Sequence, residues 1–218
     1  MAPLLQPPRY TVGEEIAHSI THGLGIVLSL VGLVILVAAA NLRGSTREVI
    51  GCTVFGVCLV ILYTTSTLYH SIPLPHLRPV LQMLDHSGIY ILIAGTYTPF
   101  TLSKLPGPVG ATLLTILWIT AVVAIVLGVV LGRRFRPVAL VLYLVMGWSI
   151  VFVLEPLRES LAPAGFSLLF AGGLAYTFGM VFYAMRKVRY SHAVWHLCVL
   201  AGSILQFLCV LLYVIPPG

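Results

Sequence analysis

The chain has 218 residues, of which 59% are hydrophobic and 8% are charged, and its formal net charge is +6 at pH 7. Soluble domains carry about 25% charged residues, so this composition excludes an ordinary soluble fold and predicts one integral membrane domain over 1–218. The positive charge does not indicate nucleic-acid binding, because the Arg and Lys residues lie between apolar segments, as in membrane proteins with a fixed orientation.

Apolar stretches of about 20 residues follow one another along the chain, which is the length that a helix needs to cross a bilayer. They predict an all-α bundle of seven transmembrane helices at 17–40, 49–70, 81–103, 109–131, 137–155, 164–185 and 192–215. The first nine residues are rich in Pro and do not resemble a cleavable signal sequence. We therefore expect a multi-pass protein of the plasma (inner) membrane.

The Lys and Arg residues are shared unevenly between alternate connections. One side of the membrane would hold eight of them: Arg9, Arg78, Arg133, Arg134, Arg136, Arg186, Lys187 and Arg189. The other side would hold four: Arg43, Arg47, Lys104 and Arg158. Because positive charge is enriched in cytoplasmic loops, the bias predicts a cytoplasmic N-terminus and a C-terminus outside.

Ionisable side chains at membrane depth are costly and often functional. The chain has one aspartate, Asp85, and seven histidines: His18, His22, His70, His76, His86, His192 and His196. On the predicted topology all of them lie toward the cytoplasmic end of the bundle. Histidines that only filled the interface would occur at both ends, so this distribution suggests a shared site.

The segment His192-Ala-Val-Trp-His196 places two imidazoles on one helix face, with Cβ atoms about 6 Å apart. Such a pair can converge on one metal ion, or it can face lipid headgroups as two interfacial residues. His70 adds a third imidazole at matching depth from another helix. Ser66 lies four residues earlier on the face of His70, where it could join the site or bond a carbonyl of its own helix.

Asp85 lies about one turn inside the third predicted helix, where a buried carboxylate needs a partner or a metal. The alternatives are a dipole partner at the helix N-terminus or an ion pair with Arg78. His86 should point about 100° away from Asp85 on a helix, and His76 lies in a loop. We expect neither histidine to be a metal ligand.

The first predicted helix opens with Glu15, His18 and His22 on one face, at positions i, i+3 and i+7. Acidic residues at a helix N-terminus suit the macrodipole. Helix capping and contacts between helices are therefore an alternative to a role in the site.

Together these motifs resemble the hemolysin III family, bacterial relatives of the progestin and adipoQ receptor family, in a superfamily that includes alkaline ceramidases. The matching segments are ExxxxxTH at Glu15–His22, SxxxH at Ser66–His70, the Asp85 segment with Gly95–Pro99 (GTYTP), and HxxxH at His192–His196. The departure is His18, where the family pattern has Asn, so the resemblance gives no role for the first-helix motif.

The resemblance implies seven helices with the N-terminus inside and a Zn²⁺ ion held by His70, His192 and His196. Asp85 would hold or activate a water molecule on the zinc, with Ser66 close by. Three protein ligands leave one position open, which is typical of catalytic zinc. The expected activity is zinc-dependent hydrolysis of a lipid amide or ester near the cytoplasmic leaflet.

Two other functions stay open at this point. One is a receptor or regulator of membrane lipid state in which the zinc is structural, and the other is a lytic or pore-forming protein. Membrane lipids are the expected partners in each case, and the sequence does not indicate an oligomeric state.

Overall fold

The computed structural model describes residues 10–185 and 187–217, without the side chain of Arg133. Within these residues every regular element is a helix, so the prediction of an all-α fold is confirmed. The α-helices are α1 (Val12–Arg43), α2 (Thr46–Ser71), α3 (Arg78–Ser103), α4 (Pro108–Leu131), α5 (Arg136–Gly147), α6 (Leu154–Ser160), α7 (Pro163–Ala184) and α8 (Ser191–Cys209). Three short segments adjoin them: the 3₁₀ turns η1 (Gly132–Phe135) and η2 (Ser149–Val153) and the π-helical η3 (Val210–Val214).

α1 begins at Val12, five residues before the predicted start at 17, because a capping box fixes its N-terminus. The Thr11 hydroxyl accepts a hydrogen bond from the Glu14 amide, and the Glu14 carboxylate accepts one from the Thr11 amide at 2.9 Å. This reciprocal pair satisfies amides that a helix otherwise leaves without partners. Glu15 consequently lies inside the helix rather than before it.

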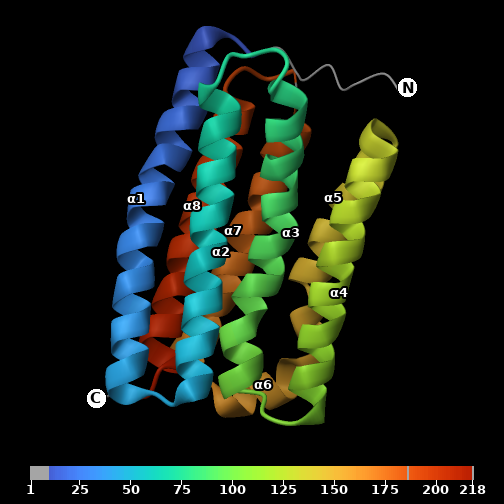
Figure 1. Ribbon diagram of the computed structural model, residues 1–218. Coiled ribbons are helices and arrows are strands. Elements are labelled where there is room, and N and C mark those ends of the chain that lie inside the picture. Colours follow the sequence, from blue (N-terminus) through green and yellow to red (C-terminus); the bar gives the residue numbers. More distant parts are fainter. Residues whose placement is uncertain (1–9, 186, 218) are drawn as a thin grey trace.

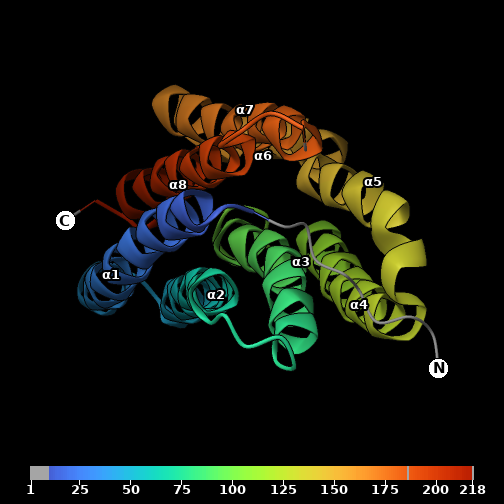
Figure 2. The same ribbon diagram turned by 90° about the horizontal axis from the view of Figure 1, so that it is seen from above.

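The helices follow one another around a ring in chain order when viewed along the bundle (Figure 2). α1 packs on α2, α2 on α3, α3 on α4, and α7 on α8. α8 also packs against α1, so the last helix closes the ring against the first. The N-terminal end of α1 and the end of η3 lie at opposite ends of the bundle (Figure 1).

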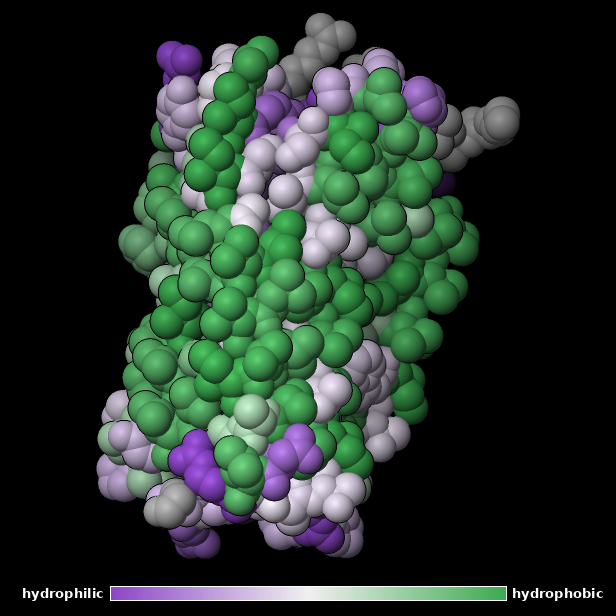
Figure 3. Space-filling model, turned by 60° about the vertical axis from the view of Figure 1, so that its left-hand side comes forward, coloured by the Kyte–Doolittle hydropathy of each residue, from purple (hydrophilic) through white to green (hydrophobic). Residues whose placement is uncertain are grey.

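The outside of the bundle is apolar over most of its length. On the face in Figure 3, hydrophobic residues form a broad band and hydrophilic residues gather toward the two ends. Large apolar side chains such as Val34, Val130 and Phe152 are exposed on α1, α4 and η2. Soluble monomers rarely expose so much continuous apolar surface, so this band indicates contact with lipid.

Six helical stretches among the described residues are long and apolar enough to cross a membrane: Val12–Arg43, Thr46–Ser71, Pro108–Leu131, Arg136–Ser160, Pro163–Ala184 and Ser191–Val214. The predicted third span corresponds to α3, which is not among these six. α3 is more polar because it carries Asp85, His86 and several hydroxyl side chains, and it packs between α2 and α4. Seven spans therefore stay a prediction.

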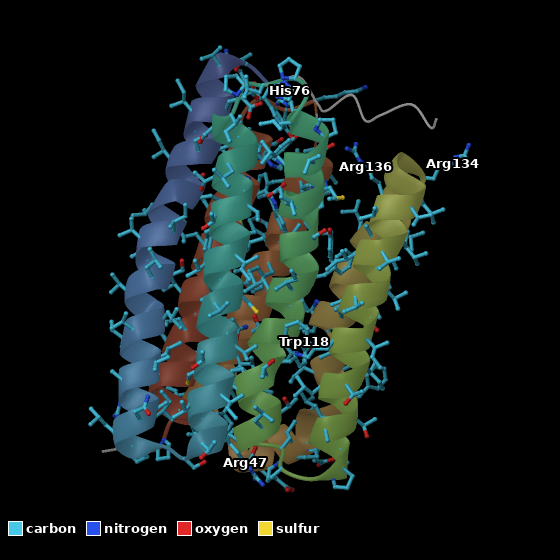
Figure 4. The ribbon with its side chains drawn as sticks, in the orientation of Figure 1. Arg47, His76, Trp118, Arg134 and Arg136 are labelled. Atoms are coloured by element: carbon cyan, nitrogen blue, oxygen red, sulfur yellow. The ribbon has the colours of Figure 1, made fainter. Side chains whose placement is uncertain are left out.

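The positions of some Arg residues at the two ends of the bundle can be compared with the predicted orientation in the membrane. Arg134 and Arg136 lie at the same end of the bundle as His76, and Arg47 lies at the other (Figure 4). Arg9, Arg186 and the C-terminal Gly218 fall outside the described residues. The side of the membrane on which each end lies stays a prediction.

The predicted fifth span, 137–155, is interrupted and extends to Ser160 as α5, η2 and α6. The interruption has a tertiary cause, because the Tyr97 hydroxyl from α3 enters the hydrogen-bond ladder of this span. It donates to the Gly147 carbonyl at 2.7 Å and accepts from the Ile150 amide at 2.9 Å. A side chain that inserts into the ladder in this way breaks or bends a helix.

Gly51 allows close packing between α2 and α3, and it provides a test of the fold. A Cβ atom at Gly51 would lie 2.7 Å from the Pro99 Cα on the neighbouring helix. We expect Gly51→Ala to lower the free energy of unfolding by about 1–3 kcal/mol, the usual effect of overpacking. Thermal unfolding of the purified protein would measure this change.

Gly23→Ala is the matched control, because no atom lies within 4 Å of a Cβ placed at Gly23 on α1. Replacing a helical Gly by Ala without a clash should stabilise by about 0.5–1 kcal/mol. An equal increase in the free energy of unfolding of Gly51→Ala and Gly23→Ala would contradict the packing of α2 on α3.

Candidate metal centre

The histidine-bearing helix ends meet at one end of the bundle. His70 is the last residue but one of α2, and Asp85 lies two turns into α3. His192 and His196 lie in the first two turns of α8, which begins at Ser191 directly after Tyr190 in the left-handed conformation (φ 59°). The Ser191 hydroxyl donates to the Met185 carbonyl at 2.9 Å and fixes the entry to the helix.

Three histidines predicted as ligands come together at this end. One ring nitrogen from each of His70, His192 and His196 lies within 4.8 Å of the others. His70 and His196 are buried, and His192 is partly buried. These atoms come from two helices that are distant in the sequence, as predicted from their depth, so the donor set fits a metal ion with three imidazole ligands.

Hydrogen bonds at the Nδ1 atoms orient two of these rings. Nδ1 of His196 lies 3.3 Å from the His18 carbonyl oxygen, and Nδ1 of His70 lies 2.6 Å from Oε2 of Glu15. A carbonyl or carboxylate oxygen only accepts, so a hydrogen bond in either contact requires the tautomer with the hydrogen on Nδ1. In that tautomer the Nε2 lone pairs would be left for a metal, and Nε2 of His70 is buried without a hydrogen-bond partner among the described residues.

His18 and His22 from α1 complete a cluster of five buried or partly buried imidazoles. The His18 ring lies 4.6 Å from that of His70, and the His22 ring stacks on that of His196 at 3.6 Å. Both ring nitrogens of His18 and of His22 are buried without hydrogen-bond partners among the described residues. The shared face of Glu15, His18 and His22 therefore does more than cap the helix, because it packs against the candidate ligands.

The candidate metal centre borders a cavity of about 140 Å³ inside the ring of helices, which His192 and His196 line. Its lining includes His22, Ser66, Asp85, His192 and His196 at the end that carries the histidines. Ser66 is buried with its hydroxyl unpartnered among the described residues, which leaves that hydroxyl available to a bound molecule. Ser66 and Asp85, predicted as the catalytic pair, thus line the same cavity as two of the three candidate ligands, His192 and His196.

The cavity continues into the apolar interior of the bundle. Along α3 its lining runs from Asp85 to Phe100, which is about 22 Å of helix at about 1.5 Å per residue. Leu62, Leu92 and Leu169 are among the apolar side chains that line it.

Asp85 does not have the ion-pair partner that the sequence suggested as an alternative. Arg78 instead pairs with Glu15. Nδ1 of His86 lies 3.5 Å from Oδ2 of Asp85, and His86 lines the same cavity. Nδ1 of His86 also lies 2.8 Å from the Gln82 carbonyl oxygen of its own helix, and the expectation that His86 is not a metal ligand stays a prediction.

Two contacts of the site lie beyond what the sequence indicated. The Tyr10 ring stacks on His192 at 5.2 Å and meets His18 edge-on at 4.7 Å, so it covers the histidines at the end of the bundle. Glu15 contacts His70 and Arg78. The i, i+3, i+7 pattern of Glu15, His18 and His22 was a signal for the second contact, although it did not identify the partners.

A family model and similar relatives point to the same protein family. The family model described as "Haemolysin-III related" matches residues 10–207. "Hemolysin-3" of Bacillus cereus is 48% identical over 205 residues, which cover 94% of each chain. "Hemolysin-3 homolog" of Bacillus subtilis (strain 168) is 47% identical over 204 residues, or 94% of this chain and 96% of that protein.

A human protein, "Monocyte to macrophage differentiation factor", is 28% identical over 209 residues, which cover 93% of this chain and 85% of that protein. No solved structure matches the chain.

Proposed function

Because the chain belongs to the haemolysin-III-related family and is a multi-pass protein of the plasma membrane, we propose that it is a zinc-dependent hydrolase of a lipid amide or ester. The observation that supports this proposal is the cluster of His70, His192 and His196, two of which, His192 and His196, line a mainly apolar cavity. That cavity follows about 22 Å of α3. One lipid tail occupies about half of a hydrocarbon core that is about 30 Å thick, so the cavity suits an acyl chain.

His70, His192 and His196 would hold the zinc ion through imidazole nitrogens. When bound, zinc would polarise the substrate carbonyl and lower the pKa of a water molecule to about 7. The reacting carbonyl of a lipid lies at the boundary between headgroup and tail, which matches a polar site at the end of an apolar cavity.

Asp85 and Ser66 supply the proton transfer and the oxyanion contact in this proposal. Asp85 takes a proton from the attacking water as its oxygen bonds to the carbonyl carbon. Ser66 donates a hydrogen bond to the carbonyl oxygen as negative charge develops there. Asp85 then returns the proton to the leaving nitrogen or oxygen as its bond to the carbonyl carbon breaks. The products are a fatty acid and an amine or alcohol.

The direct test is fatty-acid release by purified protein from ceramide-like amides and phospholipid esters in liposomes. The wild type should release fatty acid and His70→Ala should not. His76→Ala is the matched control, because His76 lies exposed in the loop between α2 and α3 (Figure 4). Loss of release in both variants, or release from no lipid by the wild type, would contradict the hydrolase.

A structural zinc in a receptor or regulator is the second candidate. The three ligands come from α2 and α8, which are distant in the sequence, so a metal ion would tie these helices together. A lytic function is suggested only by the names of the Bacillus relatives. The cavity lining favours a lipid tail over an ion path, because Leu62, Leu92 and Leu169 are apolar.

We also propose seven spans, with α3 as the seventh, a cytoplasmic N-terminus and a C-terminus outside. The 26 residues of α3 extend about 39 Å, which exceeds a hydrocarbon core of about 30 Å. The opposite placement of the α1 start and the η3 end supports an odd number of crossings (Figure 1).

Reporter fusions at the two ends of the chain are expected to report opposite sides of the membrane. The N-terminal reporter should be cytoplasmic, because Arg78, Arg134, Arg136, Lys187 and Arg189 would then face the cytoplasm. Six spans would place both reporters on the same side, which would exclude α3 as a crossing helix.

A further inference from the structure

Glu15 joins three helices at one carboxylate. It lies on the first turns of α1, and only 17% of its side chain is exposed. Its Oε2 atom lies 2.6 Å from Nδ1 of His70 on α2, and its Oε1 atom accepts a hydrogen bond from the guanidinium of Arg78 on α3. His18 is also near, but its Nδ1 lies 3.6 Å from Oε2, which is too far for a hydrogen bond.

Arg78 fixes the direction of the Glu15 carboxylate. The Arg78 guanidinium lies over the Tyr69 ring, 5.6 Å from its centroid, at a distance that allows a cation–π interaction. Tyr69 in turn accepts a hydrogen bond from Gln82 at 2.9 Å. One oxygen of Glu15 is therefore engaged by Arg78, and the other faces the ring of His70.

A second metal ion at Glu15, His18 and His70 is the competing interpretation, because their ligand atoms also lie within 4.8 Å of one another. Two ligands on a tetrahedral zinc with bonds of about 2.0–2.1 Å lie about 3.3 Å apart. The 2.6 Å between Glu15 and His70 is shorter than this and lies much closer to the length of about 2.7–2.9 Å of a charge-assisted N–H···O hydrogen bond. The guanidinium of Arg78 already supplies the positive charge that a cation would bring.

We propose that Glu15 is a positioning residue for the metal centre. It holds the proton of the His70 ring on Nδ1, so that the lone pair on Nε2 is available to the metal, and Arg78 holds Glu15 in place. This inference rests on the proposed function insofar as it places a metal at His70. It explains why Nε2 of His70 is buried and unpartnered among the described residues while Nδ1 has a short contact.

The effect on the metal follows from the general behaviour of such contacts. A carboxylate that accepts from the second nitrogen of a ligating histidine fixes its tautomer and ring orientation and raises its basicity. Loss of such a partner costs about 10–100-fold in metal affinity. Glu15→Ala should therefore weaken zinc binding by about 10–100-fold, and Glu15→Gln should weaken it less, because the Gln side-chain oxygen can still accept from Nδ1.

Glu14→Gln is the matched control. Glu14 is the neighbouring residue on the same helix end, and it accepts hydrogen bonds from Thr11 and from the Tyr190 amide. It therefore serves the structure of the helix end without a hydrogen bond to a candidate ligand. The zinc affinity of the Glu14→Gln variant should stay within about threefold of the wild-type affinity. This change is much smaller than the loss of about 10–100-fold expected when a ligating histidine loses its partner.

Two measurements test the inference on full-length protein in detergent. Competition with a chelator gives the zinc affinity of the wild type, Glu15→Ala, Glu15→Gln and Glu14→Gln. Long-range ¹H–¹⁵N spectra of the metal-free protein, labelled with ¹⁵N in its histidine rings, report the tautomer of His70, whose signals are identified by their loss in His70→Ala. Glu15→Ala should move the proton toward Nε2, and Glu14→Gln should leave it on Nδ1.

The outcomes separate the inference from the proposed function. Zinc binding by the wild type with equal affinity in Glu15→Ala would overturn the positioning role and leave the hydrolase standing. A His70 tautomer that does not change in Glu15→Ala would overturn it as well. Two zinc ions per wild-type chain, one of them lost in Glu15→Ala, would make Glu15 a ligand instead. Absence of zinc from the wild type would overturn the metal centre itself.

Discussion

Replacing His192 or His196 with Ala is expected to remove most of the bound zinc from the purified protein. Each substitution leaves two of the three imidazoles whose nitrogens lie within 4.8 Å of one another. Stable zinc sites with an open position use three protein ligands, and structural sites use four. Elemental analysis of protein purified with zinc present, expressed per chain, would measure the loss against about one ion in the wild type.

The control for this experiment is His76→Ala, which removes an exposed loop imidazole and should keep the metal. Zinc that binds only the folded protein also stabilises it, by about 2.7 kcal/mol at a free concentration 100 times the dissociation constant. Added zinc should therefore raise the thermal unfolding temperature of the wild type and of His76→Ala, but not that of His192→Ala or His196→Ala. Unchanged zinc content in both His192→Ala and His196→Ala would mean that the ligands were misassigned.

Asp85→Asn is expected to keep the metal and to lose about 10²–10⁴-fold in the rate of fatty-acid release, which is the usual loss of a positioned general base. Asn is nearly isosteric with Asp and can accept a hydrogen bond from water, but it cannot take a proton from water at neutral pH. Asp85 is buried beside the cavity, so bulk water would not replace it freely. Initial rates at saturating lipid, with zinc content measured on the same samples, would separate catalysis from metal binding.

Ser66→Ala gives a graded comparison for Asp85→Asn. Removal of one oxyanion donor costs about 10²–10³-fold at most. Equal release by the wild type and Asp85→Asn would exclude Asp85 as the base. Loss of zinc from Asp85→Asn, with no hydrolysis by any variant, would favour a structural metal.

The depth of polar residues was the most informative property of the sequence. Helical spacing and the predicted helix ends were enough to place His70, His192 and His196 at one level, and the structure brings the three rings together. This worked because helix geometry is local, so a residue's height along a bundle follows from its position in an apolar stretch. The apolar stretches of about 20 residues predicted an all-helical membrane protein correctly.

Contacts between helices could not be predicted in this way, because they depend on how each helix is rotated. The sequence suggested Arg78 as a partner for Asp85, which lies on the same helix, whereas Arg78 pairs with Glu15 on α1. The break at η2 is similar, since it depends on a hydroxyl from Tyr97 on α3. In both cases the deciding group is more than 40 residues away, and no local pattern identifies it.

Closure of the ring by the first and last helices also constrains when the histidine cluster can form. The His18 carbonyl and the His196 ring that contacts it are separated by 178 residues, and chains are synthesised from the N-terminus. α1 and α2 can enter the membrane and pack before the residues of α8 have left the ribosome. An unfinished chain therefore lacks two of the candidate metal ligands, so the bilayer receiving it is not exposed to a completed site until synthesis ends.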